Sequence, residues 1–304
     1  MSGTLFFGTR GYMQEIPMPA FNADHSKTGW GVTSQYLNGG AGVRSSVASH
    51  KVYQWSWNLA APAELRPLSD FADGVYGDEL MYFLDPITMN QNVLPQHWAF
   101  PGQGGYDGPV LIGDARPALS ATAYNSLGYP AKSARYSLSG ESASIFVPIP
   151  AGYVAWVGVH GPVTGLEGGV RVRAWSGSYS AAVFPEVLTV DSSVRVNTMF
   201  SGAGIELDLA PIAEDGYSAV YPSSTTYPSS STTPALGDPA TNIVMSGNIV
   251  QILKAGATPE TGGFISGQGH SGCRFEGKPV QMAYSAGIRD GLVGMSAKLV
   301  EVWE

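Results

Sequence analysis

The sequence contains a single cysteine, Cys273, among its 304 residues. One cysteine cannot form an internal disulfide, and it cannot build a metal site that needs several thiolates. We therefore expect the chain to be made and to fold in a reducing cytosol. None of the five histidines lies within a few residues of another, so the spacing of a local metal-ligand pair is missing too.

Charge is also scarce. Only 13% of the residues are charged, about half the usual share of roughly 25%. The balance of 16 basic and 24 acidic residues gives a net charge of −8. No basic run is present, which argues against a groove for nucleic acid. Apolar runs fall well short of the roughly 20 residues of a membrane span, and the start of the chain lacks a signal-peptide pattern. We therefore expect no nucleic acid and no membrane span among its interactions.

Turn-forming and aromatic residues are abundant instead. The chain has 39 glycines and 21 prolines, 11% aromatic residues and 44% hydrophobic residues. That composition supports a real core, and it favours β structure with many turns over a helical bundle. The sequence thus predicts a mainly β protein.

The clearest predicted strand is KVYQWSWNL, residues 51–59. Alternation places four apolar side chains on one face of this strand: Tyr53, Trp55, Trp57 and Leu59. Upstream, the turn cluster Asn38 to Gly42 separates VTSQYL from the polar stretch around Arg44, which predicts a hairpin.

Residues 62–73 form the best helix candidate, with Gly74 as a stop signal. Apolar residues recur at helical spacing: Leu65, Leu68, Phe71 and Ala72. Because proline breaks a helix interior, we expect the regular part to start near Arg66, with Pro67 in its first turn. The following segment ELMYFLDP predicts a short buried strand that ends at Pro86.

The glycine-rich segment 101–109 reads as a linker or long loop, and we place a domain boundary near residue 118. This divides the chain into an N-terminal β domain with one short helix, residues 1–118, and a second domain, residues 119–304. Short strands between turn signals predict an antiparallel β-sandwich or jelly roll for the second domain: SIFVPIP, YVAWVGVH, VRVRAW, SVRVN, GIELDL, NIVMSGNIVQIL and SAKLVEVW. Residues 221–239, rich in Ser, Thr and Pro, predict an exposed loop.

Motifs that carry chemistry are few. Residues 267–272 match G-x-G-x-x-G, but a strand-like segment follows where a dinucleotide site needs a helix, so we interpret the match as a glycine-rich turn. The same segment holds His270 and leads to Cys273, which we interpret as a small buried side chain. Neither these residues nor the acidic cluster between residues 70 and 85 forms a recognisable catalytic set. We predict no catalytic residues, no cofactor and no enzymatic activity; a wall hydrolase using loop carboxylates or His270 is the enzyme alternative.

Aromatic residues in the second region offer a different function. Tyr153, Trp156 and Trp175 could stack on sugar rings if they lie on an exposed face. Alternation puts Tyr153 and Trp156 on opposite faces of their strand, so the three cannot share one surface. Packing in the core is the other interpretation of these residues.

Several segments, in order along the chain, together resemble the minor tail proteins of actinobacterial siphophages: FFGTRGYM, YLNGGAGVRSS, LRPLSDFADGVYG, MYFLDPITMNQNVLPQHWA, GGFISGQGHSGCRFEGKP and SAKLVEVW. The resemblance implies a virion protein of the tail tip, assembled in the host cytoplasm. The predicted architecture is similar to that of distal tail proteins, whose hexameric ring joins the tail tube to the baseplate and whose outer sandwich is galectin-like or carbohydrate-binding-module-like.

This resemblance implies other copies of the chain as partners, together with the tail tube protein, the tape measure protein and other tail-tip proteins. The N-terminal hairpin and aromatic strand would then pack the ring, and Arg44 and Arg66 could make contacts between subunits. The alternative function is a tail adhesin that binds host cell-wall polysaccharide through Tyr153, Trp156 or Trp175. The family pattern supplies no catalytic residues.

Overall fold

The protein is described here from a computed structural model. The structure describes residues 3–20, 24–28, 31–35, 41–45, 50–77, 79–99, 116–120, 133–137, 144–160, 168–175, 196–211, 242–245, 247–259, 267–283 and 291–302. This part of the chain is mainly β, as the composition predicted, and the strand pairs whose register is defined are antiparallel. The chain divides into two compact units: unit 1 contains Met1–Phe83 and Gly272–Val302, and unit 2 contains Leu84–Ser271.

This division differs from the expected domains, residues 1–118 and 119–304. The reason is the last strand, β19 (Val293–Glu301), which we assigned to the sandwich. It pairs instead with β6 (His50–Ala60), from Val293↔Ala60 to Val300↔Val52. Local sequence pattern indicates that a segment is a strand, but the choice of a distant partner depends on tertiary packing.

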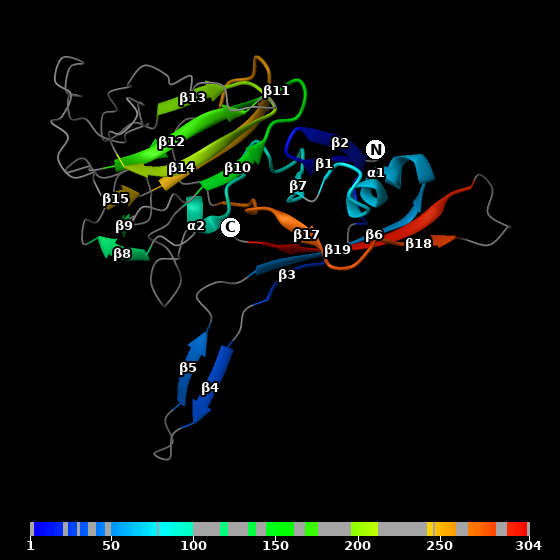
Figure 1. Cartoon of the computed structure of the whole chain (residues 1–304), viewed down its shortest axis with the longest axis horizontal. Helices are drawn as coiled ribbons and strands as arrows, with labels where there is room; N and C mark the ends of the chain where they lie inside the picture. The colour runs from blue at the N-terminus through cyan, green and yellow to red at the C-terminus, as the bar shows by residue number, and fades with distance from the viewer. Residues whose placement is uncertain are drawn as a thin grey trace. The chain divides into compact units, whose positions relative to one another are not determined.

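Unit 1 contains two main sheets, of orders β2-β1-β7 and β17-β19-β6-β3, with β18 also paired to β19. Helix α1 (Pro62–Ala72) and the three-stranded sheet lie over one face of the five-stranded sheet (Figure 1). The remaining strands are β1 (Thr4–Thr9), β2 (Tyr12–Pro17), β3 (Asp24–Thr28), β4 (Gly31–Gln35), β5 (Ala41–Ser45), β7 (Tyr82–Leu84), β17 (Cys273–Phe275) and β18 (Val280–Ala283).

The core of unit 1 is rich in aromatic rings. Trp55 of β6 is buried, and its ring centroid lies 5.9 Å from that of Phe7 in an edge-to-face arrangement. Phe7 contacts Phe71 of α1 in the same way at 5.4 Å. The indole N–H of Trp57 donates a hydrogen bond of 2.9 Å to the carbonyl of Pro17, which satisfies its polar group inside the core. The predicted aromatic face of residues 51–59 is confirmed for Tyr53, Trp55 and Trp57.

Leu59 was placed on that buried face, and this prediction is wrong. Its side chain is 55% exposed, whereas Ala60 is buried. The ladder between β6 and β19 is irregular here, because Met295 pairs with Trp57 while Val293 pairs with Ala60. One residue of β19, Gly294, therefore faces two of β6, Asn58 and Leu59, and the extra residue is a β-bulge that reverses which side chains face the core.

Helix α1 confirms the predicted helix, with Leu65, Leu68 and Phe71 buried and Gly74 in a positive-φ conformation of +74° after its end. Its start was predicted wrongly: the helix begins at Pro62, so Pro67 lies inside it. Pro62 suits the first turn, where its missing N–H leaves no bond unmade. The Glu64 carboxylate then accepts a hydrogen bond of 3.3 Å from the Ala61 N–H.

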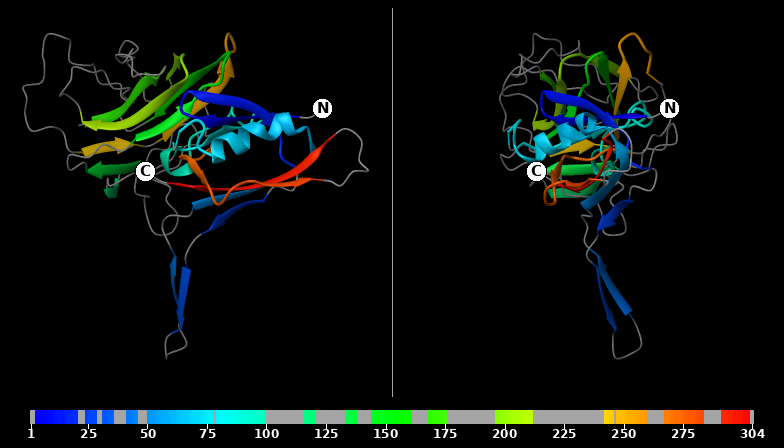
Figure 2. Two further views of the ribbon diagram at one scale, coloured as in Figure 1. Left: turned by 45° about the vertical axis from the view of Figure 1, so that its right-hand side comes forward. Right: turned by 90° about the vertical axis from the view of Figure 1, so that its right-hand side faces the viewer.

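Strands β4 and β5 confirm the predicted hairpin, with a register from Gly31↔Ser45 to Gln35↔Ala41. They form a sheet of their own. The hairpin is inserted between β3 and β6, whose adjoining ends are paired at Thr28↔His50. Figures 1 and 2 show it standing clear of the five-stranded sheet of unit 1.

Unit 2 contains three three-stranded sheets, of orders β10-β14-β12, β13-β11-β16 and β15-β9-β8. The first two carry apolar side chains on one face each, such as Ile205 and Leu207 in one and Val157 and Val250 in the other. This is consistent with the predicted antiparallel β-sandwich. The elements are α2 (Gln96–Ala99), β8 (Arg116–Ser120), β9 (Ser133–Ser137), β10 (Ser144–Pro148), β11 (Tyr153–His160), β12 (Gly168–Trp175), β13 (Val196–Phe200), β14 (Gly204–Pro211), β15 (Asn242–Met245) and β16 (Gly247–Lys254).

The strands expected in unit 2 are found within the described residues, although SVRVN is displaced, because the strand there begins at Val196. The chain forms a turn after β7, at residues 86–90. Asp85 accepts a hydrogen bond of 2.8 Å from the Ile87 N–H through its side chain. The predicted linker 101–109 and the predicted loop 221–239 lie outside the described residues.

Candidate functional site

The three aromatic residues predicted for sugar stacking lie on two different sheets. Tyr153 and Trp156 belong to β11, where they pair with Lys254 and Gln251 respectively. Three positions apart on one strand, they point to opposite faces, as alternation predicted. The indole Nε1 of Trp156 is buried and has no hydrogen-bond partner among the described residues. Trp175 is part of β12 in the other sheet, so the structure does not bring the three rings to one platform.

Trp175 is engaged by neighbouring side chains. Its ring centroid lies 5.9 Å from that of Phe146, edge to face. A Cβ added at Gly204 would lie 2.2 Å from the Phe146 ring, so only a glycine at this position allows the ring to lie where it does. The contact favours a packing role for Trp175 over an open stacking face.

The two arginines predicted at subunit contacts lie on different elements of unit 1. Arg44 is on β5 of the hairpin, paired with Val32, and its side chain is outside the described part of the structure. Arg66 projects from α1 and is 77% exposed, with its Nε 3.4 Å from Asp70 Oδ2. This exposed pair at i,i+4 contributes little stability, roughly 0.3–0.5 kcal/mol.

The glycine-rich segment 267–272 packs against residues 92–95. The Gly269 N–H donates a hydrogen bond of 3.1 Å to the Leu94 carbonyl, and the Gln268 N–H donates one of 2.9 Å to the Asn92 carbonyl. A Cβ at Gly269 would lie 1.6 Å from the Val93 carbonyl oxygen, and one at Gly267 would lie 2.4 Å from that of Leu94. The glycines thus permit a close approach of two backbone segments, and no helix N-terminus follows them to hold a phosphate.

The segment that contacts these glycines is anchored on its other side to β16. The buried Asn92 side chain accepts hydrogen bonds from the Leu94 and Val250 N–H groups at 3.2 and 3.1 Å, and donates one of 2.9 Å to the Asn248 carbonyl. Gln251 donates a further bond of 2.8 Å to the Asn90 carbonyl. The two side-chain amides thus provide hydrogen-bond partners for backbone N–H and carbonyl groups of residues 90–94 and β16, which is a structural role.

Cys273 is fully buried in unit 1 beside Tyr53, Glu301 and Lys51. Burial raises the pKa of the Cys273 thiol well above its ordinary value, the nearby Glu301 carboxylate raises it further, and Lys51 acts in the opposite direction. Burial likewise raises the pKa of Tyr53, with smaller effects of Cys273 and Glu301 in the same direction. Since the thiolate is the nucleophile, a protonated, inaccessible Cys273 is poorly suited to catalysis. His270, the other candidate in this region, is also buried.

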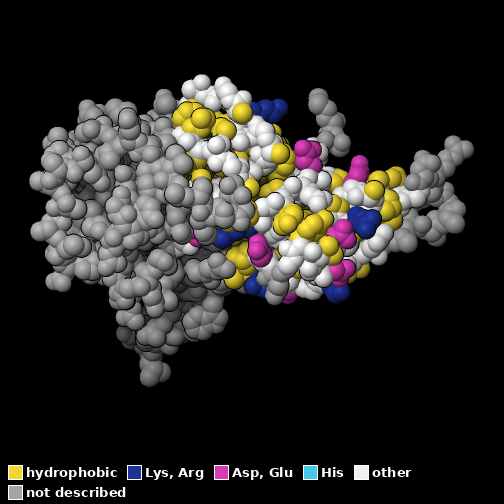
Figure 3. Space-filling model, turned by 45° about the horizontal axis from the view of Figure 1, so that its top comes forward, with side chains coloured by type: hydrophobic (Ala, Val, Ile, Leu, Met, Phe, Trp, Pro, Cys, Tyr) yellow, Lys and Arg dark blue, Asp and Glu magenta, His cyan; other side chains and the backbone are white. Residues whose placement is uncertain are grey.

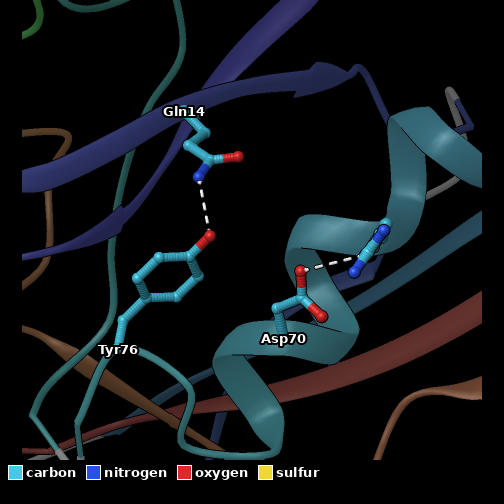
Figure 4. A network of polar contacts seen from close by, with 4 residues as sticks. Gln14, Asp70 and Tyr76 are labelled. Atoms are coloured by element: carbon cyan, nitrogen blue, oxygen red, sulfur yellow. Dashed lines mark hydrogen bonds and ion pairs between the residues drawn. The ribbon is translucent and has the colours of Figure 1, made fainter.

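A mixed aromatic and polar cluster on unit 1 was missed by the sequence analysis. The Tyr12 and Tyr76 rings lie 5.5 Å apart with a tilt of 36°, and Tyr76 in turn lies 4.4 Å from Phe71. Gln14 Nε2 donates a hydrogen bond of 3.1 Å to the Tyr76 hydroxyl (Figure 4). We call Tyr12, Gln14 and Tyr76 the tyrosine shelf.

Helix α1, which carries the Arg66–Asp70 ion pair, packs against the β2 strand of the tyrosine shelf. Figure 4 shows the side chains of Gln14 and Tyr76 pointing toward each other from β2 and from the segment after α1, with Asp70 alongside them on the helix. Tyr12 and Gln14 share the β2 face that leads to the buried Ile16, so alternation along residues 12–17 was the signal that could have placed them together. Their proximity to Tyr76, 62 residues away from Gln14, has no local signal.

Comparison with known proteins adds no name to these features. No known family matches the chain. No curated protein and no solved structure shows significant similarity to it either. The functional argument therefore depends on the residues themselves.

Within the described ranges of the chain, no group of three or more His, Cys, Asp or Glu side chains could hold a metal ion. No helix among these residues is both long enough and apolar enough to cross a membrane. The described residues do provide three features suited to binding another molecule: the β4–β5 hairpin, the exposed Arg66 and the tyrosine shelf.

Proposed function

We propose that the chain is a structural minor tail protein of a phage virion. In this proposal it forms an oligomeric, distal-tail-like ring, hexameric as the resemblance implies, that links the tail tube to the tail tip or baseplate. Its partners are further copies of itself, the tail tube protein, the tape measure protein and other tail-tip proteins. The ordered segments that resemble siphophage minor tail proteins motivate this assignment.

The observation that supports it best is the β4–β5 hairpin. Among the described elements, β4 and β5 have extensive contact only with each other. A two-stranded hairpin is at best marginally stable in water unless a third strand or another surface covers it. A partner subunit would supply that surface.

The test is to determine the oligomeric state of the purified protein by light scattering and cryo-electron microscopy, with and without the tail tube protein. The informative variant replaces residues 29–49 by a two-residue turn. The paired ends Thr28 and His50 allow this shortening without opening the β3–β6 ladder. We expect a closed ring for the parent chain, loss of the ring for the shortened chain, and an unchanged thermal unfolding midpoint for the rest of the fold.

A matched control is Met199→Ser, which changes a side chain 53% exposed on unit 2, and this variant should keep the ring. The proposal fails if the parent chain stays monomeric with and without the tube protein, or if the shortened chain assembles equally well.

A further inference from the structure

The tyrosine shelf combines stacking surface and hydrogen-bonding groups in one small area, and nothing described so far gives it a role. We propose that the shelf, together with Arg66 and Asp70, is a binding site for a neutral pyranose unit of a saccharide.

The aromatic part forms a series of rings from the core to the surface. Phe71 is buried, Tyr76 lies against it at 4.4 Å, and Tyr12 lies against Tyr76 at 5.5 Å with 58% of its surface exposed. The Tyr12 ring thus packs against Tyr76 on one side, while more than half of its surface is accessible to a ligand. A pyranose presents a face of C–H groups, which packs on the electron-rich face of such a ring.

The polar part matches the rim of hydroxyls that surrounds that face. An amide and a phenol hydroxyl are joined by the Gln14–Tyr76 hydrogen bond, and the helix packed against β2 carries the paired carboxylate and guanidinium of Asp70 and Arg66. Carboxylate, amide and guanidinium groups each present two atoms in a plane, so each can bind two neighbouring hydroxyls at once. The Gln14–Tyr76 bond fixes the orientation of two of these groups before a ligand arrives.

The charge of the cluster favours a neutral sugar over an anionic one. Arg66 is already paired with Asp70 at 3.4 Å, so the two charges offset each other and leave no excess positive charge for a carboxylate or sulfate. A protein interface of ordinary size would need a larger continuous apolar area. Figure 3 shows hydrophobic side chains of the described residues in several patches, with other and charged atoms between them.

This site uses neither the hairpin nor Arg44, on which the test of the ring depends, and it shares only Arg66 with the expected subunit contacts. It also differs from the sugar-stacking residues expected from the sequence, which all belong to unit 2. The two proposals can therefore succeed or fail separately.

The test is saturation-transfer-difference NMR on the full chain with methyl glycosides of glucose, galactose, mannose, rhamnose and N-acetylglucosamine, each at about 5 mM, which populates a millimolar site. We expect transfer to the C–H protons on one face of at least one glycoside. Tyr12→Ala should weaken binding at least about tenfold, Gln14→Ala should weaken it several-fold, and Tyr12→Phe should retain it because the ring remains. Val75→Ala, at a nearby side chain 64% exposed, is the matched control and should bind normally.

Three results would overturn the proposal. The first is the absence of transfer to every glycoside. The second is transfer that survives Tyr12→Ala but is lost in Trp156→Ala, which would assign the binding to unit 2. The third is a Tyr12→Ala chain whose sugar binding is unchanged but which self-associates less in light scattering. That result would make the shelf a contact between copies of the chain. Thermal unfolding of each variant distinguishes lost binding from lost fold.

Discussion

Replacing Gly269 by alanine tests whether the glycine-rich segment exists for backbone packing. The new Cβ would lie 1.6 Å from the Val93 carbonyl oxygen and 2.4 Å from its carbon, both atoms of backbone and not of a flexible side chain. One of the two segments must move away, which strains or breaks the bonds from Gln268 N–H to Asn92 and from Gly269 N–H to Leu94.

The expected cost follows from these two contributions. Two backbone hydrogen bonds are worth about 0.5–1.5 kcal/mol each, and forcing extra volume into a packed site costs about 1–3 kcal/mol. Partial relaxation lowers the sum, so we expect Gly269→Ala to reduce the free energy of unfolding of unit 2 by about 3 kcal/mol. The control is Gly256→Ala, where φ is +88° and nothing lies within 4 Å of the added Cβ. Backbone strain alone predicts about 1–2 kcal/mol there.

The assay is urea denaturation followed by tryptophan fluorescence, supported by hydrogen exchange of the Gln268 and Gly269 amides. Both amides should exchange much faster in Gly269→Ala and normally in Gly256→Ala. The reasoning is refuted if the two variants lose equal stability, or if the Gly269→Ala amides stay protected. In either case the glycines would need an explanation other than close backbone approach.

Three other changes have defined outcomes. The folded pKa values of Cys273 and Tyr53 are raised above 9.0 and 10.0, so the unfolded chain loses these protons at lower pH than the folded chain. The free energy of unfolding is therefore full below about pH 8 and falls at higher pH, by up to about 1.4 kcal/mol per pH unit for each group. Urea midpoints between pH 7 and 11 measure this loss, and Cys273→Ala should lessen it. Leu59→Ser should change the thermal midpoint by little, whereas Trp57→Ala should cost about 3–5 kcal/mol in the same experiment; a large loss for Leu59→Ser would contradict the bulge. Asn92→Ala should cost about 2–4 kcal/mol by chemical denaturation, since it leaves the buried Val250 and Leu94 N–H groups without their acceptor, and near-neutral behaviour would contradict this role.

Sequence pattern predicted the features that one segment determines alone. The alternation of Tyr53, Trp55 and Trp57 is a property of residues 51–57, and the spacing of Leu65 and Leu68 is a property of one helix, so both were predicted correctly. Proline preference was misleading for α1, because the packing of its apolar face outweighs the missing N–H of Pro67.

The rest depends on contacts between distant segments. The bulge that exposes Leu59 exists only because β19 pairs across it, and that pairing joins residues more than 230 positions apart, as in Val293↔Ala60. The tyrosine shelf likewise needs β2 and the segment after α1 to meet, which no local pattern specifies. The three aromatic residues chosen from sequence were reasonable by type, but pleat and sheet membership separate Tyr153, Trp156 and Trp175.

The discontinuity of unit 1 has a consequence for its synthesis. Its largest sheet has β19 between β6 and β17, so an inner strand of that sheet is synthesised after residues 84–271 of unit 2. Until β19 is made, β6 lacks this pairing partner. Residues 84–271 of unit 2 have already emerged by then and can fold as a unit. A chain interrupted before Val293 would lack the strand that closes this sheet. Translation through β19 is therefore required before the largest sheet of unit 1 can be completed.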